Sequence, residues 1–239
     1  MGSGNAQMGA VVDLNADLGE GVTDDPALLA VVTSANVACG FHAGDARVMA
    51  AVCGQAAELG VVVGAQVSYA DREGFGRRAM DPPAELLTSW VLEQVEVLTE
   101  IARAAGTSVE YVKAHGALYN RIVDDEEQAR AVLAGSGSLP VLGLPGSSVL
   151  ALAAAAGRLA VGEGFPDRGY TADGRLVPRS QPGALVTDPD EIAANAVALA
   201  ARDEIRTVCV HGDSPGAVAA AGAVRDALQA AGYAVRGWV

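Results

Sequence analysis

Short apolar runs recur along the chain, and a stretch with helical periodicity follows each of them. The runs predict buried strands at residues 10–15, 34–39, 61–67, 109–115, 139–144, 159–165 and 207–213, with a short last strand at 233–239. The stretches between them predict helices at residues 26–32, 46–59, 83–105, 126–134, 147–156, 189–201 and 217–230. Strands that alternate with helices at about thirty residues per unit are typical of a parallel β/α sheet.

The segments between these elements differ in length. Residues 16–21 predict an acidic, glycine-rich loop, and Gly116 predicts a turn into residues 117–120. Two long polar loops follow the third and the sixth strand. Loops of this length without secondary structure are usually functional.

The polar positions decide between an open sheet and a closed barrel. An open sheet gathers ligand groups at one switch point between strands, but here polar residues stand at the carboxyl ends of six strands. A barrel brings all these ends around one mouth. We therefore expect an α/β fold, a single-domain parallel β/α barrel (TIM-like) over residues 10–239. Seven-stranded or irregular closure is left open, and residues 1–9 are expected to be a flexible segment.

The composition excludes several classes of function. The chain has 239 residues, of which 51% are hydrophobic and 19% charged, and its net charge is −13. Nucleic acids and anionic membranes require basic patches, so neither is an expected partner. The three cysteines form no C-x-x-C pair and favour a reducing compartment. The Gly/Ser-rich start does not have the pattern of a leader peptide, so we expect a cytoplasmic protein.

The chain has three histidines, His42, His115 and His211, and each falls at the end of a predicted strand. A single histidine is most often an ordinary core or surface residue. Three histidines at matched positions favour a shared role, as general acids or bases or as metal ligands.

Carboxylates and an amide accompany the histidines. Asp13 and Asp213 lie on apolar strands, where an unpaired carboxylate is costly to bury. Acids mixed with histidines can hold a divalent metal, although no tight motif such as H-E-x-x-H is present. Asp45 is equally well interpreted as a helix N-cap. The full set is Asp13, Asn15, Asp17, Glu20, Asp45, Glu163 and Asp213.

Basic residues are few in this acidic chain, and five of the sixteen fall near the predicted mouth. Lys113 shares a strand face with Tyr111 and His115. The long loops carry Arg77, Arg78, Arg168 and Arg179, which suit a small anionic substrate or a phosphate, while a surface ion pair is the simpler interpretation for at least one of the first two.

Nucleotide-binding motifs give no support for a site in this chain. Residues 74–79 match G-x-G-x-x-A by count but do not stand between a strand and a helix, and no Walker A pattern is present. If ATP is used, a P-loop of this chain does not bind it.

Five stretches are long and unusual enough to identify a resemblance: residues 13–20, 34–45, 74–78, 113–120 and 211–213. With Glu163, Asp167–Arg168 and Asp173–Gly174 they resemble the LamB/YcsF family, the A subunits of prokaryotic 5-oxoprolinases, over nearly the whole chain. The resemblance implies a β/α barrel of the glycoside hydrolase/deacetylase type. It also implies cleavage of the lactam of 5-oxo-L-proline to L-glutamate, coupled to ATP hydrolysis, together with partner subunits B and C.

Hydrolysis of an unreactive lactam needs an activated carbonyl, a positioned water and a proton for the departing nitrogen. We expect His115 to transfer a proton and Lys113 to hold a carboxylate or phosphate oxygen. A divalent metal, if one is used, would be held by Asp13, His42 and His115. The expected catalytic residues are Asp13, His42, His115, His211 and Asp213. The expected substrate-binding residues are Asn15, Asp17, Glu20, Asp45, Gln66, Arg77, Lys113, Glu163 and Arg168.

One position departs from the family pattern. After Val-Gly-Ala the family usually has His-Pro, and this chain has Gln66-Val67. Glutamine forms hydrogen bonds but neither carries a proton nor replaces imidazole as a strong metal ligand. Two rival functions stay open: a stand-alone metal-dependent amide hydrolase or carbohydrate deacetylase on the same barrel, and a non-catalytic subunit that presents the substrate. The oligomeric state is also open.

Overall fold

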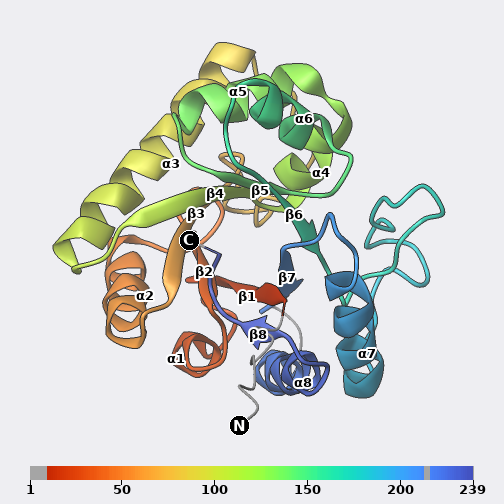
Figure 1. The fold of residues 1–239 in the computed structure, drawn as a ribbon. Helices are drawn as coiled ribbons and strands as arrows, with labels where there is room; N and C mark the ends of the chain where they lie inside the picture. The colour runs from red at the N-terminus through yellow and green to blue at the C-terminus, as the bar shows by residue number, and fades with distance from the viewer. Residues whose placement is uncertain (1–9, 213–215, 239) are drawn as a thin grey trace, which may run out of the picture.

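The structure, a computed structural model, describes residues 10–212 and 216–238, and its centre is a closed barrel of seven parallel strands (Figure 1). The barrel closes at β1, which pairs in parallel with both β2 and β7. The expected closed barrel is confirmed. Its strands are β1 (Val11–Leu18), β2 (Ser34–Ala38), β3 (Val62–Val67), β4 (Val109–Ala114), β5 (Val141–Gly143), β6 (Ala160–Gly164) and β7 (Thr207–Val210).

A ring of helices surrounds the barrel (Figure 1). Asp45 is the N-cap of α2, and Gly60 ends this helix with a left-handed φ of 68° that favours glycine. Both α2 and α8 have the bounds predicted from the sequence. The helices are α1 (Asp25–Leu29), α2 (Ala46–Leu59), α3 (Ala84–Ala104), α4 (Gly116–Asp124), α5 (Glu126–Gly135), α6 (Ser148–Ala155), α7 (Pro189–Ala200) and α8 (Ala217–Ala230).

Successive residues of each strand point to opposite sides of the barrel wall. On β1, Leu14 and Ala16 are buried in the apolar layer between strands and helices. Asp13, Asn15 and Asp17 alternate with them and form hydrogen bonds with side chains of other strands. The barrel therefore has an apolar outside and a largely polar inside.

An apolar plug closes the amino end of the barrel. Tyr111, Leu142 and Val161 form a buried cluster separate from the main core, and Trp238 packs on it with its ring centroid 5.5 Å from that of Tyr111. Trp238 follows β8 (Ala234–Val235), which pairs with the first residues of β1.

Two predicted segments are wrong in the region that forms the mouth. β1 continues to Leu18, so the predicted loop at residues 16–21 begins three residues too early. The alternation of buried apolar and buried polar residues simply continues, because the barrel interior accepts the Asp17 carboxylate.

The residues after Gly116 form the complete helix α4 rather than a turn before a helix at 126–134. Gly116 has a φ of 59° but still begins the helix, and Asp125 then separates α4 from α5 by capping the N-terminus of α5. The last predicted strand is also shorter, since β8 ends at Val235.

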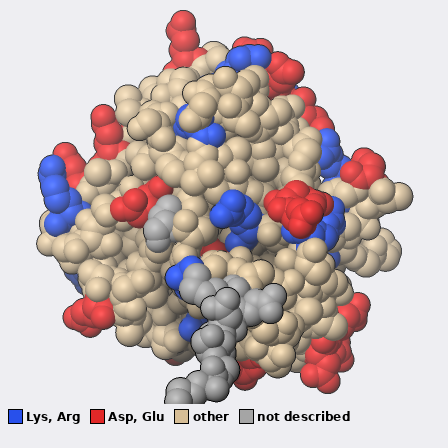
Figure 2. Space-filling model, in the orientation of Figure 1, with Lys and Arg blue, Asp and Glu red and all other residues tan. Residues whose placement is uncertain are grey.

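The molecular surface agrees with the acidic composition. Figure 2 shows acidic side chains spread around the edge of the face seen in Figure 1. Among the described residues, none of the helices combines the length and the hydropathy needed to cross a membrane.

Candidate functional site

A cavity of about 600 Å³ lies at the carboxyl end of the barrel strands. Its inner wall is formed by residues at the ends of β1, β4, β6 and β7, and its outer wall by the loops after β3 and β6 together with α4. The inner residues are Asp17, Glu20, Lys113, His115, Phe165 and His211. This is the volume of a site for a drug-sized ligand.

Lys113 is the charged centre of the inner wall. Its Nζ lies 3.0 Å from Asp17 Oδ1, 3.0 Å from Glu163 Oε1 and 3.0 Å from Cys209 Sγ. Burial alone would lower the pKa of Lys113, but the charge of Asp17, with Cys209 and Glu163, raises this pKa well above its usual value. Burial likewise opposes ionisation of Asp17, and Lys113 nevertheless holds the pKa of that carboxyl below its usual range. Lys113 is therefore a fixed cation between two carboxylates.

An amide chain supports this ion pair from inside the barrel. Asn36 Nδ2 donates to Asp17 Oδ1 over 2.9 Å and to Asn15 Oδ1 over 2.7 Å. The hydroxyl of Tyr111 donates to Asn36 Oδ1 over 2.7 Å. Asn15 thus acts through Asn36 and does not line the cavity.

Asp13 lies deeper in the barrel than the sequence analysis expected. Its carboxylate accepts hydrogen bonds from Thr33, Ser34 and Thr207, and it is fully buried. Four residues separate it from Asp17 along β1, which places it roughly 13 Å nearer the amino end. Burial raises the pKa of Asp13 to about 6. The expectation that Asp13 joins the histidines around the cavity or on a metal is wrong, because three hydroxyls hold it in another layer.

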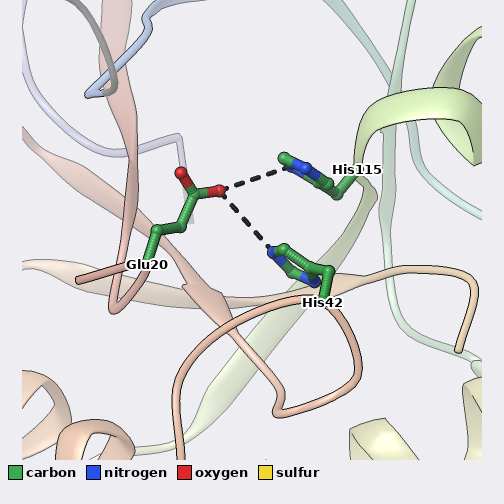
Figure 3. A group of neighbouring side chains, drawn as sticks. All are labelled: Glu20, His42 and His115. Carbon is green, nitrogen blue, oxygen red and sulfur yellow. Dashed lines mark ion pairs between the residues drawn. The ribbon is translucent and has the colours of Figure 1, made fainter. Parts of the chain in front are cut away.

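Figure 3 shows the Glu20 carboxylate facing the rings of His42 and His115. Glu20 Oε1 lies 3.6 Å from His42 Nε2 and 3.4 Å from His115 Nδ1. The two rings stack with their centroids 4.1 Å apart. The ligand atoms of these three residues all lie within 4.8 Å of one another. The structure therefore brings together two of the three expected metal ligands, with Glu20 in place of Asp13.

The amide of Gln66 connects all three members of this group. Its Nε2 lies 2.9 Å from Glu20 Oε1 and 3.1 Å from His115 Nδ1, and its Oε1 lies 3.1 Å from His42 Nε2. His115 Nε2 lies 3.0 Å from the carbonyl of Phe75, which can only accept. His115 thus carries its proton on Nε2 and accepts from Gln66 at Nδ1, and His42 donates from Nε2.

The His115 ring is consequently neutral. Burial, followed by the neighbouring His42, lowers the pKa of His115 to about 3. Both nitrogens of His115 are engaged, and His42 does not line the cavity.

His211 has a different environment. Asp167 accepts from the backbone nitrogen of His211 over 3.0 Å and lies 2.9 Å from its Nδ1. The ring stacks on Phe165 at 5.2 Å. Burial would raise the pKa of Asp167, but His211 lowers it below its usual value. Because the Asp167 carboxylate accepts the hydrogen bond from Nδ1–H, the second nitrogen, Nε2, remains for a ligand.

Several expected residues stand elsewhere. Asp45 is an exposed helix cap, and Asp213 lies outside the described residues. Arg77 and Arg168 line the cavity, while Arg78 forms surface ion pairs with Asp71 and Glu73. The sequence analysis did not include Asp167 in the site, although its position directly after the sixth strand matched that of the other candidates.

The comparisons with known proteins agree with one another. The model of the LamB/YcsF family matches residues 12–238. The 5-oxoprolinase A subunit of Streptomyces coelicolor is 55% identical, with 94% of this chain and 98% of that protein covered. The 5-oxoprolinase A subunit of Mycobacterium avium is 51% identical, with 95% and 98% covered.

Solved structures extend the likeness to the fold. The lactam utilization protein from Thermus thermophilus is 38% identical, with a TM-score of 0.87 over 95% of this chain and 100% of that chain. The catalytic domain of a peptidoglycan N-acetylglucosamine deacetylase from Eubacterium rectale is 13% identical with a TM-score of 0.57, covering 100% of this chain and 93% of that one. The second likeness concerns the fold alone.

Proposed function

The chain belongs to the LamB/YcsF family, and from that premise we propose that it is the A subunit of a cytoplasmic 5-oxoprolinase. In this function it cleaves the lactam of 5-oxo-L-proline to L-glutamate together with partner subunits B and C, coupled to ATP hydrolysis. The observation that carries the proposal is that His211, oriented by Asp167, and the cation of Lys113 line one cavity.

The proposed chemistry follows from these positions. His211 Nε2 accepts a proton from the water that adds to the lactam carbonyl and then passes it to the lactam nitrogen when the bond from that nitrogen to carbon breaks, with Asp167 hydrogen-bonded to the other side of the ring. Lys113 Nζ provides a fixed positive charge beside the carbonyl oxygen, where negative charge develops. Asp17 and Glu163 keep that ammonium charged and in place.

A divalent metal is a second component to test. The donors Glu20, His42 and His115 suit one in type and spacing, and the Phe75 carbonyl orients His115 as a partner outside the ligand shell would. A metal there would supply Lewis-acid activation of a carbonyl or a water. The Gln66 amide donates to Glu20 and His115 in the same place, so a metal would have to displace those hydrogen bonds.

This cluster is what favours the rival function, a stand-alone metal-dependent amide hydrolase or deacetylase. Elemental analysis of protein purified without added metal separates the two. One tightly bound zinc per chain would support the rival, and protein without stoichiometric metal that works with its partners would support the 5-oxoprolinase.

The decisive assay measures ATP-dependent release of glutamate from 5-oxoproline by this chain alone and with subunits B and C. We expect little release by the isolated chain and clear release by the complete mixture. Vigorous turnover by the chain alone would contradict the dependence on partners. No release by the complete mixture would contradict the proposed function. Full release with His211→Gln would instead favour the non-catalytic, substrate-presenting role.

A further inference from the structure

The cavity is larger than the substrate of the proposed function requires. 5-Oxoproline is a single small lactam ring with one carboxylate, whereas a cavity of about 600 Å³ is in the range that accommodates drug-sized ligands. Lys113 and His211 lie on the inner wall, so in the proposed function the reacting amide occupies the inner end. The outer part of the cavity has room for a further group.

The outer part has an apolar lining that comes from three separate segments. These segments are the loop after β3, α4 and the loop after β6. Several of the side chains are only partly buried, so part of their apolar surface faces the cavity. Such surface gains free energy when a ligand removes it from water. The apolar residues are Met80, Ala117, Val123, Leu176, Val177 and Pro178.

An ion pair joins the loop after β6 to α4 across this lining. Arg175 pairs with Asp124 at 2.6 Å, so each compensates the charge of the other. Leu176 follows Arg175 in the chain, and Val123 precedes Asp124. Leu176 and Val123 therefore lie on neighbouring walls of the same part of the cavity.

The loop after β3 is joined to α4 in the same way. Arg121 of α4 pairs with Asp81 at 3.1 Å, and Met80 precedes Asp81 in the chain. The two ion pairs hold the three segments together with their apolar residues around one space. The lining therefore exists before a ligand arrives.

The chemistry of the lactam determines which group reaches this lining. When the carbonyl oxygen lies at Lys113 and the nitrogen at His211, the amide of the ring occupies the inner end. The carboxyl group, on the ring carbon next to the nitrogen, is then the substituent that extends toward the mouth. A residue joined to this carboxyl group by an amide bond would bring its side chain to the outer part of the cavity.

We propose that the outer part of the cavity is a subsite for an apolar side chain joined to the carboxyl group of 5-oxoproline. The ligand class then includes 5-oxoprolyl amides whose second residue is apolar, such as the amino-terminal end of a peptide that begins with 5-oxoproline. This inference rests on the proposed function for the identity of the inner ring.

The test titrates the full chain in a calorimeter with 5-oxoprolyl-leucine and with 5-oxoprolyl-glycine. Both dipeptides have the same lactam ring, peptide bond and single carboxylate, so they differ only in the leucine side chain. We expect the leucine dipeptide to bind about tenfold tighter or more, equivalent to about 1.4 kcal/mol. Its binding should also have the more negative heat-capacity change, because this change reports burial of apolar surface.

The variant Leu176→Ala/Val177→Ala removes apolar surface from the loop after β6. Both side chains are only partly buried, so we expect the variant to fold. It should bring the two Kd values to within about twofold of each other. Leu159→Ala is the matched control, because Leu159 is 48% exposed and is not among the residues that line the cavity. The control should keep the wild-type preference for leucine.

Three results of these titrations would overturn the subsite. They are equal Kd values of wild type for the two dipeptides, a preference for leucine that persists in the double variant, and no binding of either dipeptide at tens of millimolar. The other candidate occupant of the lining is an apolar side chain of a partner subunit. In that case 5-oxoprolyl-leucine would inhibit glutamate release by the complete complex no better than 5-oxoprolyl-glycine, and this result would also overturn the proposal.

The subsite and the proposed function fail in different ways. Absence of glutamate release from 5-oxoproline by the complete complex, with the preference for leucine intact in the isolated chain, overturns the function and leaves the subsite standing. Normal glutamate release with equal binding of the two dipeptides overturns the subsite and leaves the function standing.

Discussion

The two histidine groups at the barrel mouth use the same side chain in opposite ways. His42 and His115 are 1% and 5% exposed and share an amide and a carboxylate between them. The side chain of His211 is 14% exposed, has one carboxylate on one nitrogen and stacks on Phe165. The first group is a buried hydrogen-bond network in which only His42 Nδ1 has no partner among the described residues. The second group leaves one nitrogen available to the cavity.

The difference teaches that position at a strand end does not by itself make a histidine reactive. Every hydrogen-bonding atom of His115 has a partner, so a proton transfer there would break a bond to Gln66 or Phe75. A ligand that forms a hydrogen bond with His211 Nε2 would leave the bond between Nδ1 and Asp167 intact. The prediction that His115 transfers the proton stays a prediction, and the geometry makes His211 the stronger candidate.

The largest expected effect separates the two groups directly. His211→Gln in the complete complex should lower turnover by roughly 100- to 10,000-fold, the usual cost of losing a positioned acid or base. His115→Gln should instead lower the thermal midpoint and retain most of the turnover. Turnover and thermal unfolding measured on both variants decide between them. A loss with His115→Gln that equals the loss with His211→Gln, at unchanged stability, would reverse the comparison.

The second prediction concerns the ion pairs of Lys113 with Asp17 and Glu163. Lys113→Met should destabilise the protein by about 3–5 kcal/mol, because Asp17 and Glu163 would stay buried without their cation. Denaturant unfolding measures this change. The double variant Lys113→Met/Glu163→Gln should recover part of the loss, and a single variant as stable as wild type would show that the ion pair does not hold the mouth together.

A smaller effect is expected at Gln66, which lies at the centre of the network of Glu20, His42 and His115. Gln66→Leu removes the amide that serves Glu20, His42 and His115 and should cost about 1–3 kcal/mol. The surface change Gln229→Leu on α8 is the control and should be nearly neutral. Equal stabilities of the two variants would mean that the network is not a structural unit.

The last prediction concerns how stability changes with pH. Burial raises the pKa of Asp13 from 3.8 to about 6, so the folded state binds the proton more tightly than the unfolded chain. The free energy of unfolding should therefore fall as pH rises between about 4 and 6. The slope should correspond to a difference of less than one bound proton between the folded and unfolded states. Asp13→Asn should lack this fall, as unfolding at several pH values would show. A slope identical to that of wild type would mean that Asp13 is not its source.

Much of this architecture could be predicted from the sequence, because the apolar period was regular. Asp45 and Gly60 marked the ends of α2 by local chemistry, and the strand ends carried the residues that line the mouth. Local chemistry did not show which layer of the barrel each polar residue occupies. Asp13 and Asp17 have the same period on β1, and only the neighbouring strands decide that the first meets hydroxyls and the second meets Lys113.

The pairing of Asp167 with His211 was also beyond the sequence. These residues are separated by 44 positions and follow different strands, so nothing local links them. The same holds for Gln66, whose departure from the family pattern was visible but whose three partners were not.

The apolar plug of Tyr111, Leu142, Val161 and Trp238 lies at the amino end of the barrel, and the cavity lies at the carboxyl end. Among the described residues, this cluster fills the end of the barrel opposite the cavity, so we expect product to leave by the route that substrate took. The two ligands then exclude each other, and glutamate should act as a competitive inhibitor towards 5-oxoproline.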